Sequence, residues 1–271
     1  MPRCCLLWGL LLLTGCLASP TPPSPSPSAS TPAEITLFAA SSLTDAFTEL
    51  GAAFERSQPG SHVTFNFGSS SQLRAQLEQG AHADLFASAD EAQMTAARAA
   101  GVLVGEPRVF AYNRLTIVVP RDNPRRVEGV RDLAQPGLKF VTSQLSVPIG
   151  QYTLAMLDRA SADPTFGPDF RARVERNIVS REDNVRQIVA KVQLGEADAG
   201  VVYTSDVTPR VRDLLVELPI PDGLNSVARY PIAVARGANE AAAQAFIDYV
   251  LSPRGQEILA RWGFHTLDSP P

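Results

Sequence analysis

Two clusters of serine hydroxyls each follow a strand-like run and precede a helix-like run. The first cluster contains Ser42, in the segment ITLFAASSLTDAF, and the second contains Ser70, in FGSSSQLRAQLEQG. A helix N-terminus presents N–H groups and a partial positive charge, so hydroxyls placed there can help to bind an anion. If the two strands are parallel neighbours, both serines lie at the sheet edge where α/β proteins bind ligands. The chemistry that these residues indicate is anion binding.

Helix capping is a simpler interpretation of each serine. Serine is a favoured N-cap residue, and Ser42 followed by Asp45 is similar to a capping box. A nucleophilic serine is disfavoured because the chain has no Gly-x-Ser-x-Gly, Walker, Gly-x-Gly-x-x-Gly or His-Glu-x-x-His motif. The histidines His62, His82 and His265 are not spaced as a metal-binding pair. We predict that the chain is not an enzyme, binds no metal cation and needs no cofactor.

The elements that position these serines are predicted from hydrophobic periodicity. From Glu34 onward, short β-branched or aromatic runs alternate with helical patterns, which predicts an α/β protein with mostly parallel sheets. Two apolar runs, RLTIVVP and YPIAVA, are interpreted as the places where the chain crosses between two lobes. The predicted strands are 35–40, 62–67, 84–89, 114–120, 139–142, 199–203, 214–219 and 230–235.

Composition limits the classes of function. The chain has 271 residues, of which 45% are hydrophobic, so it can bury the core of one large domain or two modest ones. Its formal net charge is -4 and its aromatic content is 7%. A nucleic-acid-binding protein would instead present a basic face, so we predict no nucleic-acid partner.

The N-terminal segment has the features of an export signal. Residues 1–15 contain one arginine and a short apolar run, and they end in Leu-Thr-Gly directly before Cys16. This ending is similar to the lipobox of bacterial lipoproteins, which predicts lipidation of Cys16; the alternative is an ordinary secretory signal. Residues 16–33 are rich in Pro, Ser and Thr, which predicts an extended tether. Since Cys4 and Cys5 lie in the signal, we predict no disulfide in the mature fold.

Several longer motifs together carry a resemblance to a known family. They are ITLFAASSLTDAF, FGSSSQLRAQLEQGAHADLFASAD, SVPIGQYTLAML, EDNVRQIVAKVQLGEADAGVVYTSD, and YPIAVARGAN followed by AFIDYVLSPRGQEILARWGF. In this order, over 35–264, they resemble the molybdate-binding proteins of bacterial ABC transporters. The resemblance implies a type II periplasmic-binding-protein fold, with two lobes, two crossover segments and an oxyanion between the lobes. Lobe one would comprise 34–112 and 233–271, and lobe two would comprise 113–232.

The resemblance also implies five molybdate-binding residues. Ser42 and Ser70 would donate hydroxyl and backbone N–H groups, and Ile149 and Val185 would donate backbone N–H groups. Tyr203 would donate its phenol O–H. On pattern alone, Tyr203 would be a core tyrosine at a strand end and Val185 the first core position of a helix. Ile149 replaces the small alanine of some family members, which could change closure of the cleft.

The function implied is that of a monomeric, exported, lipid-anchored solute-binding protein. It would capture molybdate, and tungstate as well, and deliver it to an ABC transporter permease. Molybdenum would be bound as an oxyanion and not as a cation, and the lipid would be the only contact with the membrane. The alternatives are a sulfate or other oxyanion binder of the same fold, an exported serine hydrolase, and a structural or adhesive lipoprotein.

Overall fold

The computed structural model describes Met1 and residues 33–271. The predicted signal peptide, nearly all of the predicted tether and the lipidation site Cys16 lie outside the described residues. Within the described residues, no helix is both long enough and apolar enough to cross a membrane.

Strands and helices alternate along most of the described chain. The strands are β1 (Glu34–Ala40), β2 (His62–Gly68), β3 (Leu85–Ala87), β4 (Leu103–Pro120), β5 (Phe140–Ser143), β6 (Ile178–Glu182), β7 (Ala199–Tyr203), β8 (Leu215–Pro219) and β9 (Val227–Ala235). The α-helices are α1 (Thr44–Ser57), α2 (Ser70–Glu78), α3 (Glu91–Ala99), α4 (Pro148–Ala162), α5 (Phe170–Glu175), α6 (Val185–Gln193), α7 (Glu240–Leu251) and α8 (Pro253–Arg261). The short 3-10 turns are η1 (Ser41–Leu43), η2 (Val130–Ala134) and η3 (Thr204–Asp206).

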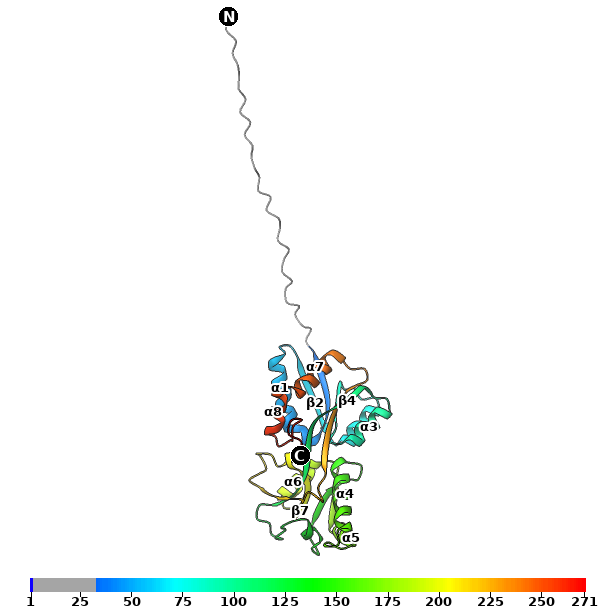
Figure 1. Cartoon of the computed structure of the whole chain (residues 1–271), viewed down its shortest axis with the longest axis vertical. Coiled ribbons are helices and arrows are strands. Elements are labelled where there is room, and N and C mark those ends of the chain that lie inside the picture. The colour runs from blue at the N-terminus through cyan, green and yellow to red at the C-terminus, as the bar shows by residue number, and fades with distance from the viewer. Residues whose placement is uncertain (2–32) are drawn as a thin grey trace. The chain divides into compact units, whose positions relative to one another are not determined.

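The long strand β4 joins two groups of strands. Its first part pairs with β9, beside β3, β1 and β2, and its last part pairs with β7 and β8, beside β5 and β6. In Figure 1, β4 and β9 run between the helices α1, α7 and α8 at one end and α4, α5 and α6 at the other. Two strands therefore connect the two halves of the fold.

The sheets are more mixed than the sequence predicted. The pairs β1–β2, β1–β3, β5–β6 and β5–β7 are parallel, as expected for strands linked by helices. The pairs that include β4 or β9 are antiparallel, because these strands carry the chain between the halves. The α/β class is confirmed, and the lobe boundaries stay a prediction.

All eight predicted strand segments are strands in the structure, and two features were missed. β4 begins at Leu103, well before the predicted start at residue 114, because its first residues lack a continuous apolar run. β6 was not predicted at all, since its residues are only half-buried or exposed and the segment IVSRE has two apolar residues.

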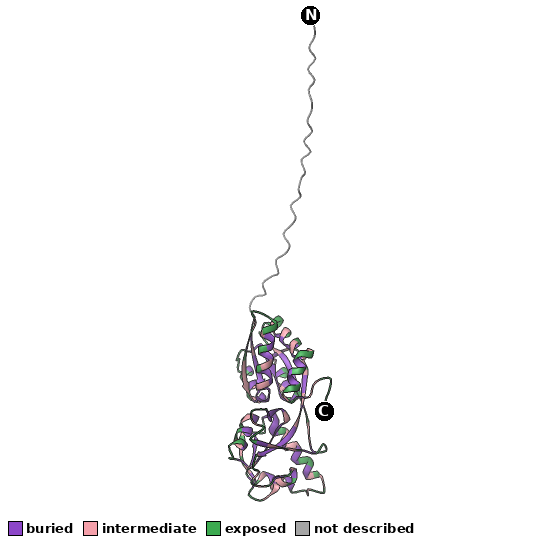
Figure 2. Ribbon diagram, turned by 90° about the vertical axis from the view of Figure 1, so that its left-hand side faces the viewer, coloured by how far each residue is buried: buried purple, intermediate pink, exposed green. Residues whose placement is uncertain are grey.

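Close packing of α6 on β7 determines where two of the predicted site residues lie, Val185 at the start of α6 and Tyr203 at the end of β7. A Cβ atom at Gly200, in β7, would come within 2.6 Å of Ile188 Cγ2, in α6. The helix can therefore lie directly on the strand, with Ile188 and Val192 fully buried. Figure 2 shows buried residues along the strands and on the inner faces of the helices, with exposed residues on the outside.

Candidate functional site

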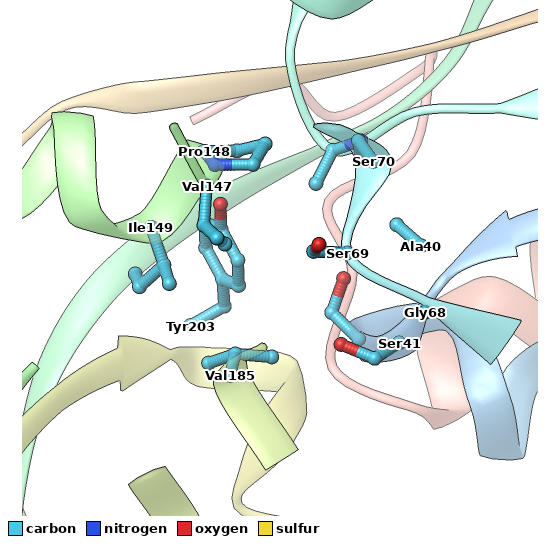
Figure 3. Close-up of a pocket in the computed structure, with 12 residues that line it drawn as sticks. Ala40, Ser41, Gly68, Ser69, Ser70, Val147, Pro148, Ile149, Val185 and Tyr203 are labelled. Atoms are coloured by element: carbon cyan, nitrogen blue, oxygen red, sulfur yellow. The ribbon is translucent and has the colours of Figure 1, made fainter. Parts of the chain in front are cut away.

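A single small pocket brings together all five residues that the resemblance indicated. Ser42 and Ser70 lie on the β1–β2 side, and Ile149, Val185 and Tyr203 lie across from them. Figure 3 shows the serine-bearing loops facing Pro148, Ile149, Val185 and Tyr203 over the pocket. The space between the lining atoms is about 200 Å³, including the open mouth. The other lining residues are Ala40, Ser41, Gly68, Ser69, Ala89, Val147 and Pro148.

The first two of the three consecutive serines after β2 have different roles. Ser69 is the N-cap of α2, because its hydroxyl oxygen accepts the Gln72 N–H at 3.4 Å. Ser70 is the first residue of the helix and is buried, and its hydroxyl oxygen accepts the Ala89 N–H at 3.0 Å. Since the Ser70 oxygen already accepts a backbone proton, its own O–H remains able to donate. Both serines line the pocket, but capping accounts for the Ser69 hydroxyl, whereas the Ser70 O–H is able to donate into the pocket.

Ser42 is not a helix cap, so the capping-box interpretation was wrong. Neither η1 nor α1 has a side-chain capping hydrogen bond at its N-terminus. The Ser42 hydroxyl instead lies 3.0 Å from the hydroxyl of Tyr230, and both residues are buried. The Asp45 carboxylate forms an ion pair with Arg186 at 2.9 Å. The residue types of a capping box are present, but their side chains form tertiary contacts.

Two helix N-termini contribute backbone donors from the other side of the pocket. Ile149 is the second residue of α4 and follows Pro148, which has no N–H, so its N–H is the first in that helix. Val185 is the first residue of α6, whose N-cap Asn184 accepts the Gln187 N–H at 3.2 Å. The first N–H groups of a helix have no intrahelical partner and carry its partial positive charge. Both residues are thus placed to donate to an anion.

Tyr203 supplies a buried hydroxyl that has no partner. It is the last residue of β7 and is 1% exposed, and its hydroxyl makes no hydrogen bond among the described residues. A buried polar group left in this state costs about 1–3 kcal/mol. Burial also raises the pKa of the Tyr203 phenol well above its usual value, so the group remains a protonated donor. An acceptor bound in the pocket would satisfy it.

The charged groups next to the pocket form ion pairs with one another, and Arg210 lies 3.8 Å from Asp45 as well. Arg186 forms ion pairs with Asp45 at 2.9 Å and with Asp206 at 3.3 Å, and its Nε donates to the Ser41 carbonyl at 3.2 Å. None of the twelve residues that line the pocket in the described chain has a charged side chain. The described residues also contain no group of three His, Cys, Asp or Glu side chains able to hold a metal ion. What the pocket offers is a set of neutral hydrogen-bond donors.

Asp206, next to the pocket, makes the stability of the fold depend on pH. Burial raises the pKa of its carboxyl from 3.8 to about 6, although Arg186 and the Tyr203 N–H lower it. Between pH 4 and pH 6 the folded chain therefore binds more protons than the unfolded chain, so this residue's contribution to stability falls as pH rises through that window.

We expect Asp206→Asn to remove this contribution. The free energy of unfolding of the wild type, minus that of the variant, should decrease by up to about 3 kcal/mol between pH 4 and pH 6. Urea denaturation at a series of pH values measures it, with the exposed Asp248→Asn as the matched control. If the free energy of unfolding changes with pH in the same way in the wild type and in Asp206→Asn, the pKa of Asp206 is not raised by folding.

Comparison with known proteins assigns the chain to a family. The family model described as "Bacterial extracellular solute-binding protein" matches residues 35–265. The chain belongs to this family. It is 38% identical to the molybdate-binding protein ModA of Mycobacterium tuberculosis over 253 residues, covering 93% of this chain and 92% of the relative.

Solved structures agree with the fold. A substrate-binding domain from Clostridium difficile superposes with a TM-score of 0.64 at 28% identity, covering 87% of this chain and 99% of that one. The sulfate-binding protein SubI of Mycobacterium tuberculosis superposes with a TM-score of 0.78 at 20% identity, covering 87% of this chain and 88% of that one. The two-lobed type II fold predicted from the sequence is confirmed. Because proteins of this fold differ in ligand, the choice of anion depends on the pocket.

Among the residues at this pocket that sequence reasoning missed, two carry hydroxyl groups next to Ser42. Ser41 lines the pocket, and Tyr230 lies behind Ser42 with its hydroxyl in contact. The doubled serine in AASSL was a signal for Ser41. Tyr230 is 188 positions from Ser42 along the chain, so no local pattern connects the two residues.

Proposed function

We propose that this chain captures molybdate outside the cytoplasm and delivers it to the permease of an ABC transporter. The observation that carries the proposal is the buried Tyr203 hydroxyl, which lacks a partner among the described residues and lies in a pocket that serine hydroxyls and two helix N-termini also line. The similarity to a molybdate-binding protein over nearly the whole chain supports the same ligand. As in other solute-binding proteins, no catalytic step is involved.

Neutral donors are sufficient to hold a tetrahedral dianion. Each hydrogen bond to a charged acceptor contributes about 1.5–3 kcal/mol. Ser42, Ser70, Ile149, Val185 and Tyr203 would supply such bonds from both sides of the pocket. Because one anion would be bound by both halves of the fold, binding favours the closed arrangement of the two halves.

A pocket that only donates also selects among oxyanions. Molybdate, tungstate and sulfate carry no proton near neutral pH, whereas hydrogen phosphate has an O–H that needs an acceptor. Phosphate should therefore bind poorly. Molybdate and tungstate have the same shape and charge, so we propose that both bind, and the smaller sulfate would be separated from them by size.

Calorimetric titration of the purified chain with molybdate, tungstate, sulfate and phosphate tests the proposal. One-to-one binding of molybdate and tungstate, with weak sulfate and no phosphate signal, is the expected result. Sulfate bound as tightly as molybdate would identify a general oxyanion binder instead. Failure of all four anions to bind would favour the serine-hydrolase or adhesive alternatives, which an acyl-serine probe separates.

We also propose that the protein is tethered to the membrane through lipid on Cys16. The support is the lipobox-like ending at Leu-Thr-Gly-Cys and the uncharged Pro/Ser-rich segment after it. Mass spectrometry of the mature N-terminus tests it. Detection of an unmodified Cys16, or of an N-terminus that does not begin at Cys16, would exclude the lipid anchor.

A further inference from the structure

The hydroxyl of Tyr230 makes the one side-chain hydrogen bond of Ser42 in the described structure. The two oxygens are 3.0 Å apart, and Tyr230 is fully buried. Its ring is held edge-on by Phe110, Tyr203 and Phe264, with centroid distances of 6.3, 5.8 and 5.4 Å. The Tyr230 hydroxyl therefore has little freedom to move, and which of the two oxygens donates decides what Ser42 can do.

The surroundings of Asn113 determine the direction of this hydrogen bond. The Arg114 N–H donates to the Asn113 side chain at 3.0 Å, and the Thr204 hydroxyl donates to the same atom at 2.9 Å, which identifies that atom as the carbonyl oxygen. The amide nitrogen of Asn113 therefore faces the other way. It donates to the Ser205 hydroxyl at 2.8 Å and, over a longer distance of 3.5 Å, to the Tyr230 hydroxyl oxygen.

Among the described residues, the Tyr230 hydroxyl has two hydrogen-bond partners, Ser42 and the Asn113 amide nitrogen. The amide nitrogen can only donate, so Ser42 is the acceptor left for the Tyr230 proton. The Ser42 oxygen then accepts from Tyr230, and the Ser42 O–H is free to donate into the pocket. Ser70 is in the same state, since its oxygen accepts the Ala89 N–H at 3.0 Å. Both serines are thus prepared as donors before any anion arrives.

We propose that Tyr230, aligned by Asn113, is a positioning residue that keeps Ser42 a hydrogen-bond donor and so makes the pocket select fully deprotonated oxyanions. A serine oxygen that already accepts one hydrogen bond, and whose own O–H is directed at the anion, has at most one lone pair left and is a weaker acceptor for the O–H of hydrogen phosphate. This inference rests on the proposed function and adds to it the residues that determine the polarity of the pocket.

The same network connects the two sides of the pocket. Thr204 and Ser205, which contact Asn113, directly follow Tyr203 in the chain. Asn113 lies in β4 and Tyr230 in β9, the two strands that connect the halves of the fold. Positioning of Ser42 on one side is therefore coupled through buried side chains to the segment that carries Tyr203 on the other.

Tyr230→Phe tests the inference, since it removes the hydroxyl and keeps the ring. Molybdate affinity should fall about fivefold, because Ser42 is no longer held as a donor. Phosphate should also compete better with molybdate in this variant. The phosphate concentration that displaces half of the bound molybdate, after correction for the change in molybdate affinity, should fall by about tenfold. The reason is that the Ser42 oxygen, no longer bonded to Tyr230, can accept the P–OH proton. The matched control is Tyr249→Phe, a half-buried tyrosine that packs on Phe54 away from the pocket; neither quantity should change there.

A double-mutant cycle on the full chain separates positioning from packing. In the Ser42→Ala background, Tyr230→Phe should have no further effect on either quantity, because the residue through which it acts is gone. Asn113→Asp provides a second variant: its carboxylate would draw the Tyr230 proton away from Ser42. It should weaken molybdate binding more in the Ser42 protein than in the Ser42→Ala protein.

The outcomes distinguish this inference from the proposed function. If the wild type binds molybdate but Tyr230→Phe changes neither affinity nor the phosphate ratio, the positioning role is overturned and the proposed function stands. Equal losses with and without Ser42 would likewise overturn it, as a packing effect. If the wild type binds none of the oxyanions, the proposed function itself fails.

Discussion

Replacing Ser42 and Ser70 together with alanine is expected to weaken molybdate binding by about a hundredfold or more. Each serine would donate one charge-assisted hydrogen bond to the dianion, and loss of such a bond costs about 1.5–3 kcal/mol, or roughly tenfold to a hundredfold in affinity. The loss is not shared by neighbouring side chains, because the pocket lining in the described chain has no cation that could compensate. Calorimetric titration of the two single variants and the double variant measures it.

Ser57→Ala is the matched control for the loss of a serine hydroxyl. Ser57 ends α1, where its hydroxyl donates to the Phe54 carbonyl at 2.8 Å, and it is exposed and away from the pocket. Its replacement should leave molybdate affinity unchanged. Thermal unfolding without molybdate should show that the two single variants, the double variant and the control are all folded. Wild-type affinity in the double variant would mean that the serines do not contact the anion.

Gly150→Ala is expected to impair both the fold and the pocket. A Cβ atom at this position would come within 2.3 Å of the Gln144 carbonyl oxygen and 2.9 Å of the Ser143 carbonyl oxygen. Both are backbone atoms, so the start of α4 must move away from β5, and the Ile149 N–H moves with it. We expect a loss of about 1–3 kcal/mol in the free energy of unfolding and at least about a tenfold loss in molybdate affinity.

Urea denaturation and titration of the same preparation measure the two effects of Gly150→Ala. Gly129→Ala is the matched control, because a Cβ there meets no atom within 4 Å and its φ of 177° is ordinary extended backbone. The control should resemble the wild type in both measurements. A Gly150→Ala protein that is destabilised but binds molybdate normally would show that the start of α4 does not position a ligand.

The alternation of strands and helices was predictable because burial imposes a local period. A helix that covers a sheet must be apolar on one face, as Phe47, Leu50 and Phe54 are in α1. β6 escaped prediction because it is half-exposed and its sequence carries little of that pattern. The antiparallel pairing of β4 and β9 also has no local signature, since both join segments far apart in the chain.

The residues of the candidate site could be predicted from the sequence, but the hydrogen bonds that their side chains form could not. Ser42 and Ser70 stand out because each follows a strand and precedes a helix, and Ile149, Val185 and Tyr203 were placed by resemblance to a family. Sequence alone left open whether the serines were caps. The answer depends on Tyr230 and Ala89, which reach Ser42 and Ser70 only in the folded chain.

By itself, the sequence determined the order of elements, the positions of hydroxyls at strand-to-helix turns and the absence of a basic residue among them. These features follow from side-chain types and short spacings, which act within one or two turns of chain. Only the tertiary structure decided that Arg186 forms ion pairs with Asp45 and Asp206, that the buried Tyr203 hydroxyl has no partner among the described residues, and that Tyr230 holds Ser42. Hydrogen-bond direction and charge neutralisation depend on distances between atoms, and folding alone brings residues so distant in sequence within reach.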